Sequence, residues 1–258
     1  MATTKKSEPV FTPTPEAKSQ ATTSRIIAIV LWVVAIGLEL FTILWVMRPS
    51  FDELAAAKGF PQWRWWLLIG MIVVIGVLAV VGSLLWKKAN RLDPASSKDT
   101  VRFFVQNQLG AIIALIAFVP LIIVIFMNKD MNGQQKGIAG GIGIVVALVA
   151  VYFGIDFKPM SQEQAAVESQ VVTQLTGQDK VWWATASGKV MHLCAEASDL
   201  KQSKEVTSGT TAEALSHSGM EGMTLKLEQE LPQCGITPPS PEKLAEIVDW
   251  VQQSRAHK

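Results

Sequence analysis

Four long apolar stretches dominate the hydropathy pattern of the chain between residues 26 and 157, and polar or charged residues separate them. A helix needs about 20 residues to cross the roughly 30 Å of hydrocarbon in a bilayer. The stretches that meet this length are Ile26–Met47, Trp65–Trp86, Leu109–Met127 and Ile138–Phe157. Because a helix pairs its own backbone N–H and C=O groups, four transmembrane helices are the predicted structure.

None of these stretches carries the polar stripe that a surface helix of a soluble bundle shows, which argues against a soluble protein. We therefore predict an α-helical integral membrane protein with four transmembrane helices and a small soluble C-terminal α+β domain. Residues 1–25 are rich in Thr, Pro, Lys and Ser, and we expect a disordered tail there. Residues 158–178 predict a linker helix and residues 179–258 the α+β domain, in which the alternating segment MTLKLEQEL predicts a strand.

The distribution of Lys and Arg predicts the orientation, because the short connections on the cytoplasmic side carry more of them. The N-terminal tail has four and the central connection has five, whereas the other two connections have three and two. We therefore expect the protein in the cell (plasma) membrane with a cytoplasmic N-terminus, and the even number of spans returns the C-terminus to the cytoplasm. The formal net charge of +1 gives no reason to expect a nucleic acid as partner.

Glu39 lies well inside the first apolar stretch, where inserting a carboxylate costs about 2.5–3.5 kcal/mol. We expect it to face other helices or to be protonated. One interpretation is a proton or cation relay or a contact to a quinone, and the second titratable group of a relay would then be Asp156. The interpretation that we favour is a neutral Glu39 hydrogen-bonded to a neighbouring helix. Pro120 predicts a kink in the third helix.

Glycines at the start of the fourth stretch predict close helix packing. Gly137 and Gly141 form a GxxxG pair, and Gly143 with Ala139 repeats the small-residue spacing on the adjacent face. Small side chains let a second helix come close, which compensates for the weak hydrophobic drive between helices in lipid. The partner helix would belong either to this chain or to another subunit.

The C-terminal domain contains the two cysteines of the chain, Cys194 and Cys234. His192 lies two residues before Cys194, so both would point to one face of a strand. Three interpretations compete: two buried thiols, a disulfide if the domain were exported, and a zinc site completed by His217. The cytoplasmic orientation favours thiols first, then the disulfide, and the ligand spacing for zinc is poor. We therefore expect no metal and no cofactor.

The segment ASGKVMHLCAEASDLK, followed by TSGTTAEAL and LPQC, resembles a module of uncharacterised actinobacterial membrane proteins. In that module a GKVYH strand precedes a cysteine, an SGT turn leads into a helix, and a cysteine pair closes the unit. The matching residues are Gly188, Lys189, Val190, His192, Leu200, Ser208, Gly209 and Thr210. Ala197 stands in the place of the module's cysteine, and Cys234 lacks its partner, so the resemblance implies a degenerate module.

The overall layout also resembles the accessory subunits of the actinobacterial cytochrome bcc–aa3 respiratory supercomplex. No P-loop, Rossmann glycine fingerprint, CxxCH or GxSxG motif occurs in the chain, and no His lies in a predicted span to bind haem. The function that we predict is a non-catalytic accessory or scaffolding subunit whose partners are lipids and other integral membrane subunits, with bcc–aa3 oxidase components as candidates. The alternatives are a small transporter or channel-like protein that uses Glu39, and a membrane sensor with a ligand-binding or metal-binding C-terminal domain.

Overall fold

The computed structural model describes residues 13, 15–185, 188–217 and 219–256. In this part of the chain four helices are long and apolar enough to cross a membrane, which confirms the predicted fold class and indicates a multi-pass membrane protein. The long helices are α1 (Pro15–Phe41, continued by the π-helix η1, Thr42–Val46), α3 (Gln62–Leu92), α4 (Thr100–Met127) and α5 (Gly133–Gly154). The chain forms two compact units, a helical bundle and a unit that contains the C-terminal elements.

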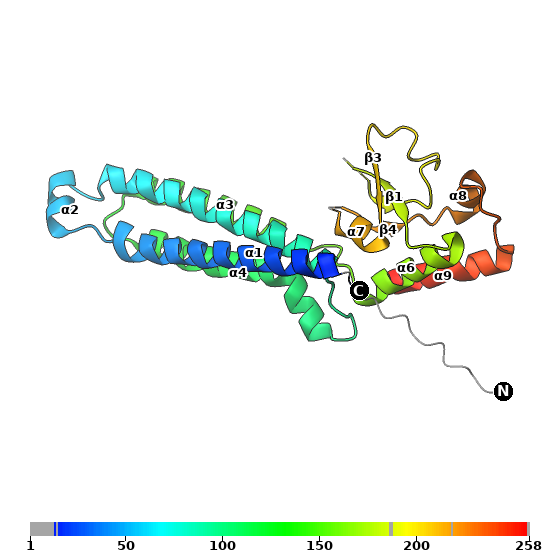
Figure 1. The fold of residues 1–258 in the computed structure, drawn as a ribbon. Helices are drawn as coiled ribbons and strands as arrows, with labels where there is room; N and C mark the ends of the chain where they lie inside the picture. The colour runs from blue at the N-terminus through cyan, green and yellow to red at the C-terminus, as the bar shows by residue number, and fades with distance from the viewer. Residues whose placement is uncertain (1–12, 14, 186–187, 218, 257–258) are drawn as a thin grey trace. The chain divides into compact units, whose positions relative to one another are not determined.

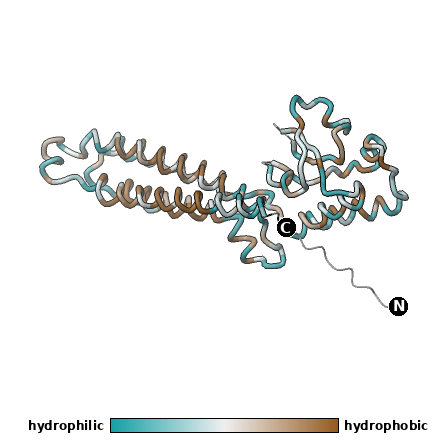
Figure 2. The backbone as a smooth tube through the Cα atoms, in the orientation of Figure 1, coloured by the Kyte–Doolittle hydropathy of each residue, from teal (hydrophilic) through white to brown (hydrophobic). Residues whose placement is uncertain are grey.

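The first unit is the helical bundle of residues 23–87 and 107–157. Figure 1 shows α1, α3 and α4 running alongside one another, and Figure 2 shows hydrophobic residues along these helices and hydrophilic residues near their ends. The interior contains the fully buried side chains of Leu68, Ile72 and Ile75 on α3 and of Phe118 and Leu121 on α4. Large apolar side chains also cover the outside of the bundle, as expected for a surface that contacts lipid.

Glycines allow the backbones of α4 and α5 to come into contact. A Cβ atom added to Gly154 would lie 2.3 Å from the backbone nitrogen of Ala111, and one added to Gly110 would lie 3.0 Å from the Cα of Gly154. A side chain at Gly76 on α3 would similarly meet Cγ1 of Val146 on α5 at 2.3 Å. These positions have no room for a side chain, so they are where the bundle depends on glycine.

A short helix, α2 (Phe51–Ala57), lies in the connection between α1 and α3. The Ser50 hydroxyl accepts a hydrogen bond from the backbone N–H of Glu53, and the Glu53 carboxylate accepts one from the backbone N–H of Ser50. Arg64 at the start of α3 is 5% exposed and donates to both carboxylate oxygens of Glu53, at 3.1 and 3.0 Å. It also donates to the carbonyl oxygen of Trp45 and lies over the Trp45 and Trp63 rings. Arg64 therefore fastens this connection to the ends of α1 and α3.

The second unit comprises residues 1–22, 88–106 and 158–258. Its C-terminal portion contains α6 (Gln162–Thr176), β1 (Val181–Ala184), β2 (Val190–Met191), β3 (Val206–Gly209), α7 (Thr211–Ser216), β4 (Gly222–Met223), α8 (Leu227–Gln233) and α9 (Pro241–Ala256). β1 pairs with β3 in an antiparallel sheet, and β2 pairs with β4 in parallel. A bridge between Trp182 and His192 connects β1 to the end of β2.

A buried carboxyl group holds three elements of this unit together. Glu168 on α6 is fully buried and accepts hydrogen bonds from Arg255 on α9 at 2.9 Å, from Gln164 at 3.0 Å and from the backbone N–H of Met223 in β4 at 2.7 Å. Burial raises the pKa of Glu168, and the Arg255 guanidinium opposes that rise. Gly222 is required beside it, because a Cβ there would lie 2.3 Å from a Glu168 carboxyl oxygen and the residue has φ +140°.

Two predicted elements differ from the structure. Helix α1 begins at Pro15, so it includes residues 15–25, for which a disordered tail was expected; residues 1–12 and 14 lie outside the described residues. The physical reason is a small apolar contact in which Ala17 and Ala21 pack with Ala89 and Leu92. The strand predicted for MTLKLEQEL is also wrong beyond Met223, because α8 begins within this segment at Leu227.

Candidate functional site

Glu39 is the one sequence-predicted polar residue within the first span, and the structure places it in the interior of the bundle. Its side chain is near the C-terminal end of α1 and is 2% exposed. The carboxyl group lies beside the backbone of Leu121 on α4, and its Oε1 atom has no hydrogen-bond partner among the described residues. Glu39 therefore faces a neighbouring helix, and its Oε1 atom is unsatisfied.

Pro120 lies next to the part of α4 that faces Glu39. Proline has no backbone N–H and its ring crowds the carbonyl one turn earlier, so the regular hydrogen bonding of a helix is interrupted around it. Pro120 is one residue before Leu121, whose backbone lies beside the Glu39 carboxyl group. On α1, the π-helix η1 begins three residues after Glu39, and π-helical turns often occur at functional sites.

Asp156 does not join Glu39 in a relay. Asp156 is buried and follows the last residue of α5, and its backbone N–H donates to the carbonyl oxygen of Asn107. Because α1 and α5 run in opposite directions across the bundle, the end of α1 and the end of α5 lie at opposite ends of it. The two carboxyl groups are therefore separated along the bundle axis by most of the length of a span.

The contacts of Glu39 lead to a prediction that compares two substitutions. Glu39→Gln should keep the four helices assembled, because the amide keeps the size of the side chain and can both donate and accept a hydrogen bond. Glu39→Leu should weaken helix association by about 1–2 kcal/mol, the size of an interhelical hydrogen bond in a membrane. The measurement is the folded fraction of each variant in a series of increasingly harsh detergents. Equal behaviour of the two variants in that series would show that the hydrogen bond contributes nothing to assembly.

Gly143 lies on a different face of α5 from Gly137 and Gly141. A Cβ at Gly143 would meet Ile122 of α4 at 3.3 Å and Ile72 of α3 at 4.0 Å, so this glycine packs inside the bundle. At Gly137 and Gly141 a Cβ would meet no atom of another helix within 4 Å among the described residues. Gly140, nearer the N-terminal end of α5, also packs against α4, because a Cβ there would lie 2.4 Å from the Phe126 ring. The GxxxG pair thus faces away from the other described helices, and it does not serve packing among them.

Cys194 and Cys234 are joined by a disulfide with a Cα–Cα distance of 5.5 Å. This differs from the ranking made from the sequence, in which two free thiols came first. Cys194 follows β2, and Cys234 caps the C-terminal end of α8, so the fold brings together two residues that are 40 positions apart. Cys194 is 8% exposed, and Cys234 is partly buried.

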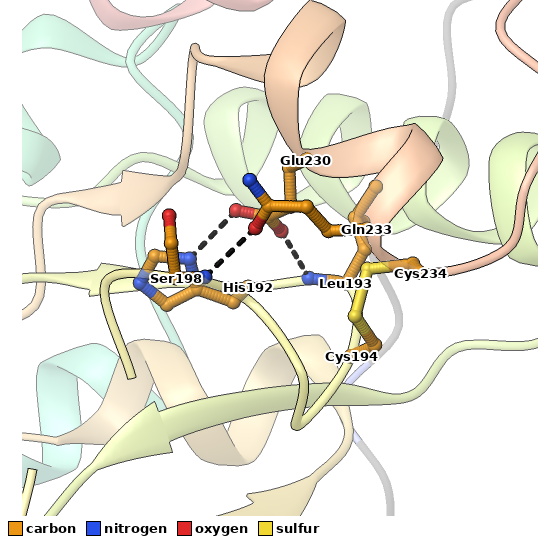
Figure 3. Close-up of a disulfide and its surroundings, with 7 residues drawn as sticks. All are labelled: His192, Leu193, Cys194, Ser198, Glu230, Gln233 and Cys234. Atoms are coloured by element: carbon orange, nitrogen blue, oxygen red, sulfur yellow. Dashed lines mark hydrogen bonds and ion pairs between the residues drawn. A yellow bond between two sulfur atoms is a disulfide. The ribbon is translucent and has the colours of Figure 1, made fainter. Parts of the chain in front are cut away.

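A polar cluster surrounds this disulfide (Figure 3). His192 Nδ1 lies 2.7 Å from Oε2 of Glu230, and the backbone N–H of Leu193 donates to Oε1 of the same carboxyl group at 2.6 Å. The backbone N–H of Ser198 donates to the side chain of Gln233 at 2.8 Å. His192 and Glu230 are 3% and 5% exposed. The segment around Cys194 is therefore attached to α8 by a covalent bond and by three hydrogen bonds.

The residues suggested for a metal site do not form one in this structure. Cys194 and Cys234 are bonded to each other, and His192 uses Nδ1 to contact Glu230. His217 caps the end of α7, where its carbonyl oxygen accepts a hydrogen bond from Arg91 at 2.9 Å. Among the described residues no group of three His, Cys, Asp or Glu side chains has a geometry that could hold a metal ion.

The central connection between α3 and α4 packs on α6 through Glu163. The carboxylate accepts hydrogen bonds from the Ser96 hydroxyl at 2.5 Å and from the backbone N–H and the hydroxyl of Ser97, both at 2.9 Å. Partial burial alone would raise the pKa of Glu163, but these hydrogen bonds outweigh it and hold the pKa below its usual range. The segment that carries the largest cluster of positive charge is thus held against the C-terminal portion of the chain.

Comparisons with protein-family models, with curated proteins and with solved structures find no match to this chain. The candidate sites are therefore supported only by the geometry of this chain. No motif in the sequence pointed to Glu230, Glu168 or Arg64, whose side chains the structure buries in contact with His192, Arg255 and Glu53, respectively. Glu168 lies on α6 and Arg255 on α9, and each of these helices has an apolar face. Charged residues of opposite sign on two such helices are the only sequence feature that could have indicated their contact.

Proposed function

We propose that this protein is a non-catalytic accessory or scaffolding subunit of a larger integral membrane complex. The observation that supports this proposal is the outward-facing GxxxG pair, Gly137 and Gly141, whose missing side chains leave a shallow surface that no other helix of the described chain fills. Hydrophobic burial hardly drives helix association in lipid, so close van der Waals packing at small residues takes its place. A helix of another subunit is the partner that such a surface suits.

The residues that continue this surface along α5 are apolar and exposed. We define the outer face of α5 as Gly137, Gly141, Ile144, Val145 and Leu148, which follow one another at helical spacing. Val145 and Leu148 are 60% and 64% exposed. The face therefore begins with two positions that permit close approach and continues with side chains that can pack against a partner.

The resemblance to accessory subunits of the actinobacterial cytochrome bcc–aa3 supercomplex makes components of that respiratory complex the first candidates for the partner. Other integral membrane subunits with a small-residue stripe would also suit the outer face of α5. Lipids would cover the remaining apolar surface of the bundle. Neither of these partners requires a catalytic residue in this chain.

The orientation that belongs to this proposal places both termini in the cytoplasm of a plasma-membrane protein. The N-terminal side carries nine Lys and Arg residues in the tail and the central connection, against five on the other side. Lys158, just after α5, adds to the same side, although it is paired with Glu221 at 2.5 Å. The bias of positive charge therefore supports a cytoplasmic C-terminal domain.

Gly141→Ile tests the proposal, because the isoleucine has room within the chain. We expect the variant to insert and fold as the wild type does, and to lose its partner subunit, because the new side chain would push the partner helix away from α5. The measurement is the amount of co-purified partner per molecule of this protein in mild detergent, which should fall at least about tenfold for a loss of about 1.4 kcal/mol or more.

Gly70→Ile is the matched control for this experiment. Gly70 lies on α3, is exposed, and has no atom within 4 Å of an added Cβ, so the same substitution is made at an outward glycine of a different helix. It should retain the partner. Gly154→Ile should disrupt the bundle itself, because its Cβ would lie 2.3 Å from a backbone atom of α4. Partner retention by Gly141→Ile would contradict a role for the outer face of α5.

A second candidate function rests on one observation, the unsatisfied Oε1 atom of Glu39. A buried carboxyl oxygen without a donor suits the binding of a proton or a small cation, as in a small transporter or channel-like protein. Reconstituted vesicles would distinguish the two functions. A transporter should carry a proton or cation flux that Glu39→Gln abolishes as completely as Glu39→Leu does, whereas an accessory subunit should carry none.

A further inference from the structure

We propose that Cys194 and Cys234 form a reversible redox pair whose disulfide locks the segment after β2 onto α8. The inference rests on the cytoplasmic orientation proposed above, and it concerns a property that an accessory role does not require. Disulfides in the reducing cytoplasm are rare, and those that occur are usually transient or redox-sensing. A cysteine pair that the fold holds at bonding distance in that compartment is therefore expected to open and close with the thiol redox state.

The contacts on both sides of the disulfide keep the two sulfur atoms close when the bond is open. Glu230 accepts hydrogen bonds from the backbone of Leu193 and contacts His192, and Gln233 accepts one from the backbone of Ser198. These contacts join residues next to Cys194 to residues of α8 next to Cys234. Because none of them involves sulfur, reduction leaves them in place, and the thiols remain positioned to form the bond again.

The two sulfur atoms differ in access, which defines the order of the exchange. Cys194 is nearly buried, whereas Cys234 is partly buried at the exposed end of α8. A cytoplasmic thiol, as thiolate, attacks the Cys234 sulfur, and the Cys194 sulfur leaves with the electron pair and takes up a proton. A second thiol then attacks the mixed disulfide, which frees Cys234 and releases the oxidised thiol as its own disulfide. The reverse reaction uses that same disulfide as the oxidant.

The element under this control is the exposed loop between Cys194 and β3. Its inner side contributes Ala197 and Leu200, which are 1% and 3% exposed, whereas Lys201 and Lys204 face solvent. The loop has no strand or helix of its own, so the disulfide is the strongest attachment near its start. Opening of the disulfide should therefore loosen the part of the loop beyond Ser198, which includes Lys201 and Lys204, and leave the elements around Glu168 folded.

Thiol trapping in intact cells tests the redox pair. Cells that express the full chain are treated with a membrane-permeant, mass-tagged maleimide before and after exposure to the thiol oxidant diamide, and again after its removal. We expect two tagged cysteines, then none, then two again. A bond that is already complete in untreated cells and resists a permeant reductant would overturn the proposal, as would thiols that stay free in diamide.

A parallel sample separates failure of the redox pair from failure of the orientation. After reduction, a membrane-impermeant maleimide should leave Cys194 and Cys234 unlabelled in intact cells and label them in lysed cells. Labelling from outside would place the domain in an oxidising compartment, where the disulfide is a permanent structural bond, and this result overturns both the orientation and the switch. Absence of outside labelling together with an unreactive pair overturns the switch alone.

Limited proteolysis measures whether reduction of the disulfide loosens the loop between Cys194 and β3. Trypsin should cut the purified full-length protein at Lys201 and Lys204 at least about tenfold faster in the reduced state, because local opening of the loop controls the rate. The double variant Cys194→Ser with Cys234→Ser is the matched control, and it should be cut at the faster rate whether or not a reductant is present. Equal rates for the oxidised and reduced wild-type protein would show that the bond does not lock the loop.

Discussion

Replacement of Glu168 by leucine is expected to lower the free energy of unfolding of the C-terminal portion of the chain by about 3–5 kcal/mol, the usual cost of removing one partner of a buried ion pair. The substitution leaves the buried backbone N–H of Met223 without its acceptor, and it removes the carboxylate partner of the partly buried Arg255 guanidinium. Hydrogen exchange of α6 and α9 amides in the purified full-length protein is the measurement. It should accelerate by a few hundred-fold or more.

Two further variants separate the charge from the loss of volume. Glu168→Gln keeps the size of the side chain and one acceptor oxygen for Arg255. It should therefore lower the free energy of unfolding clearly less than Glu168→Leu does. The double variant Glu168→Leu with Arg255→Met removes both charges and should recover part of the stability lost in Glu168→Leu. If the α6 and α9 amides of Glu168→Leu exchanged hydrogen at the wild-type rate, the Glu168 contacts would not be what holds α6, β4 and α9 together.

Removal of the disulfide by Cys194→Ser with Cys234→Ser should cost about 4 kcal/mol, because the bond closes a loop between residues 40 positions apart and so restricts the unfolded chain. For a portion of this size the expected decrease in Tm is about 15 °C. Thermal unfolding of the full-length protein, followed by protease resistance of the C-terminal portion, measures it. The wild-type protein in reductant should unfold at the temperature of the double variant, and a Tm unchanged by either treatment would contradict the expectation.

The membrane part of the fold could be predicted from the sequence because the bilayer fixes the length of an apolar helix. The helix ends could not be predicted as well, since hydropathy marks the hydrocarbon region and not the end of the helix. Helix α3 extends from Gln62 to Leu92, beyond the predicted Trp65–Trp86, because polar residues continue the helix outside the apolar region. Helix α1 likewise continues back to Pro15, where Ala17 and Ala21 pack on the end of α3.

The C-terminal portion was less predictable because local alternation competes there with tertiary contacts. In the segment MTLKLEQEL the apolar residues alternate, but Leu227 and Leu231 also share the four-residue spacing of a helix, and both are fully buried. Glu230, between them, turns inward to His192 and so makes the helical register the better one. That contact involves residues 38 positions apart, and no local pattern in the sequence contains it.

In the candidate sites too, the local sequence predicted some features, whereas others depend on tertiary contacts. Burial of Glu39 follows from its place in an apolar stretch, and the structure adds the contact to Leu121 next to Pro120. The glycine spacing of α5 indicates faces that permit close packing but cannot say which face meets the rest of the chain. The structure assigns Gly143 to the interior and Gly137 and Gly141 to the outside. Bonding of the two cysteines depends on how β2 and α8 meet, which their spacing in the sequence does not determine.

Purification of the full-length protein from its native membrane in mild detergent, with quantitative identification of every co-purified protein, tests the proposed function most directly. An accessory subunit should elute with other integral membrane subunits in constant stoichiometry, and the bcc–aa3 oxidase components are the first to look for among them. Elution of the wild-type protein as a monomer or as a homo-oligomer, without any stoichiometric partner, would contradict the proposed role.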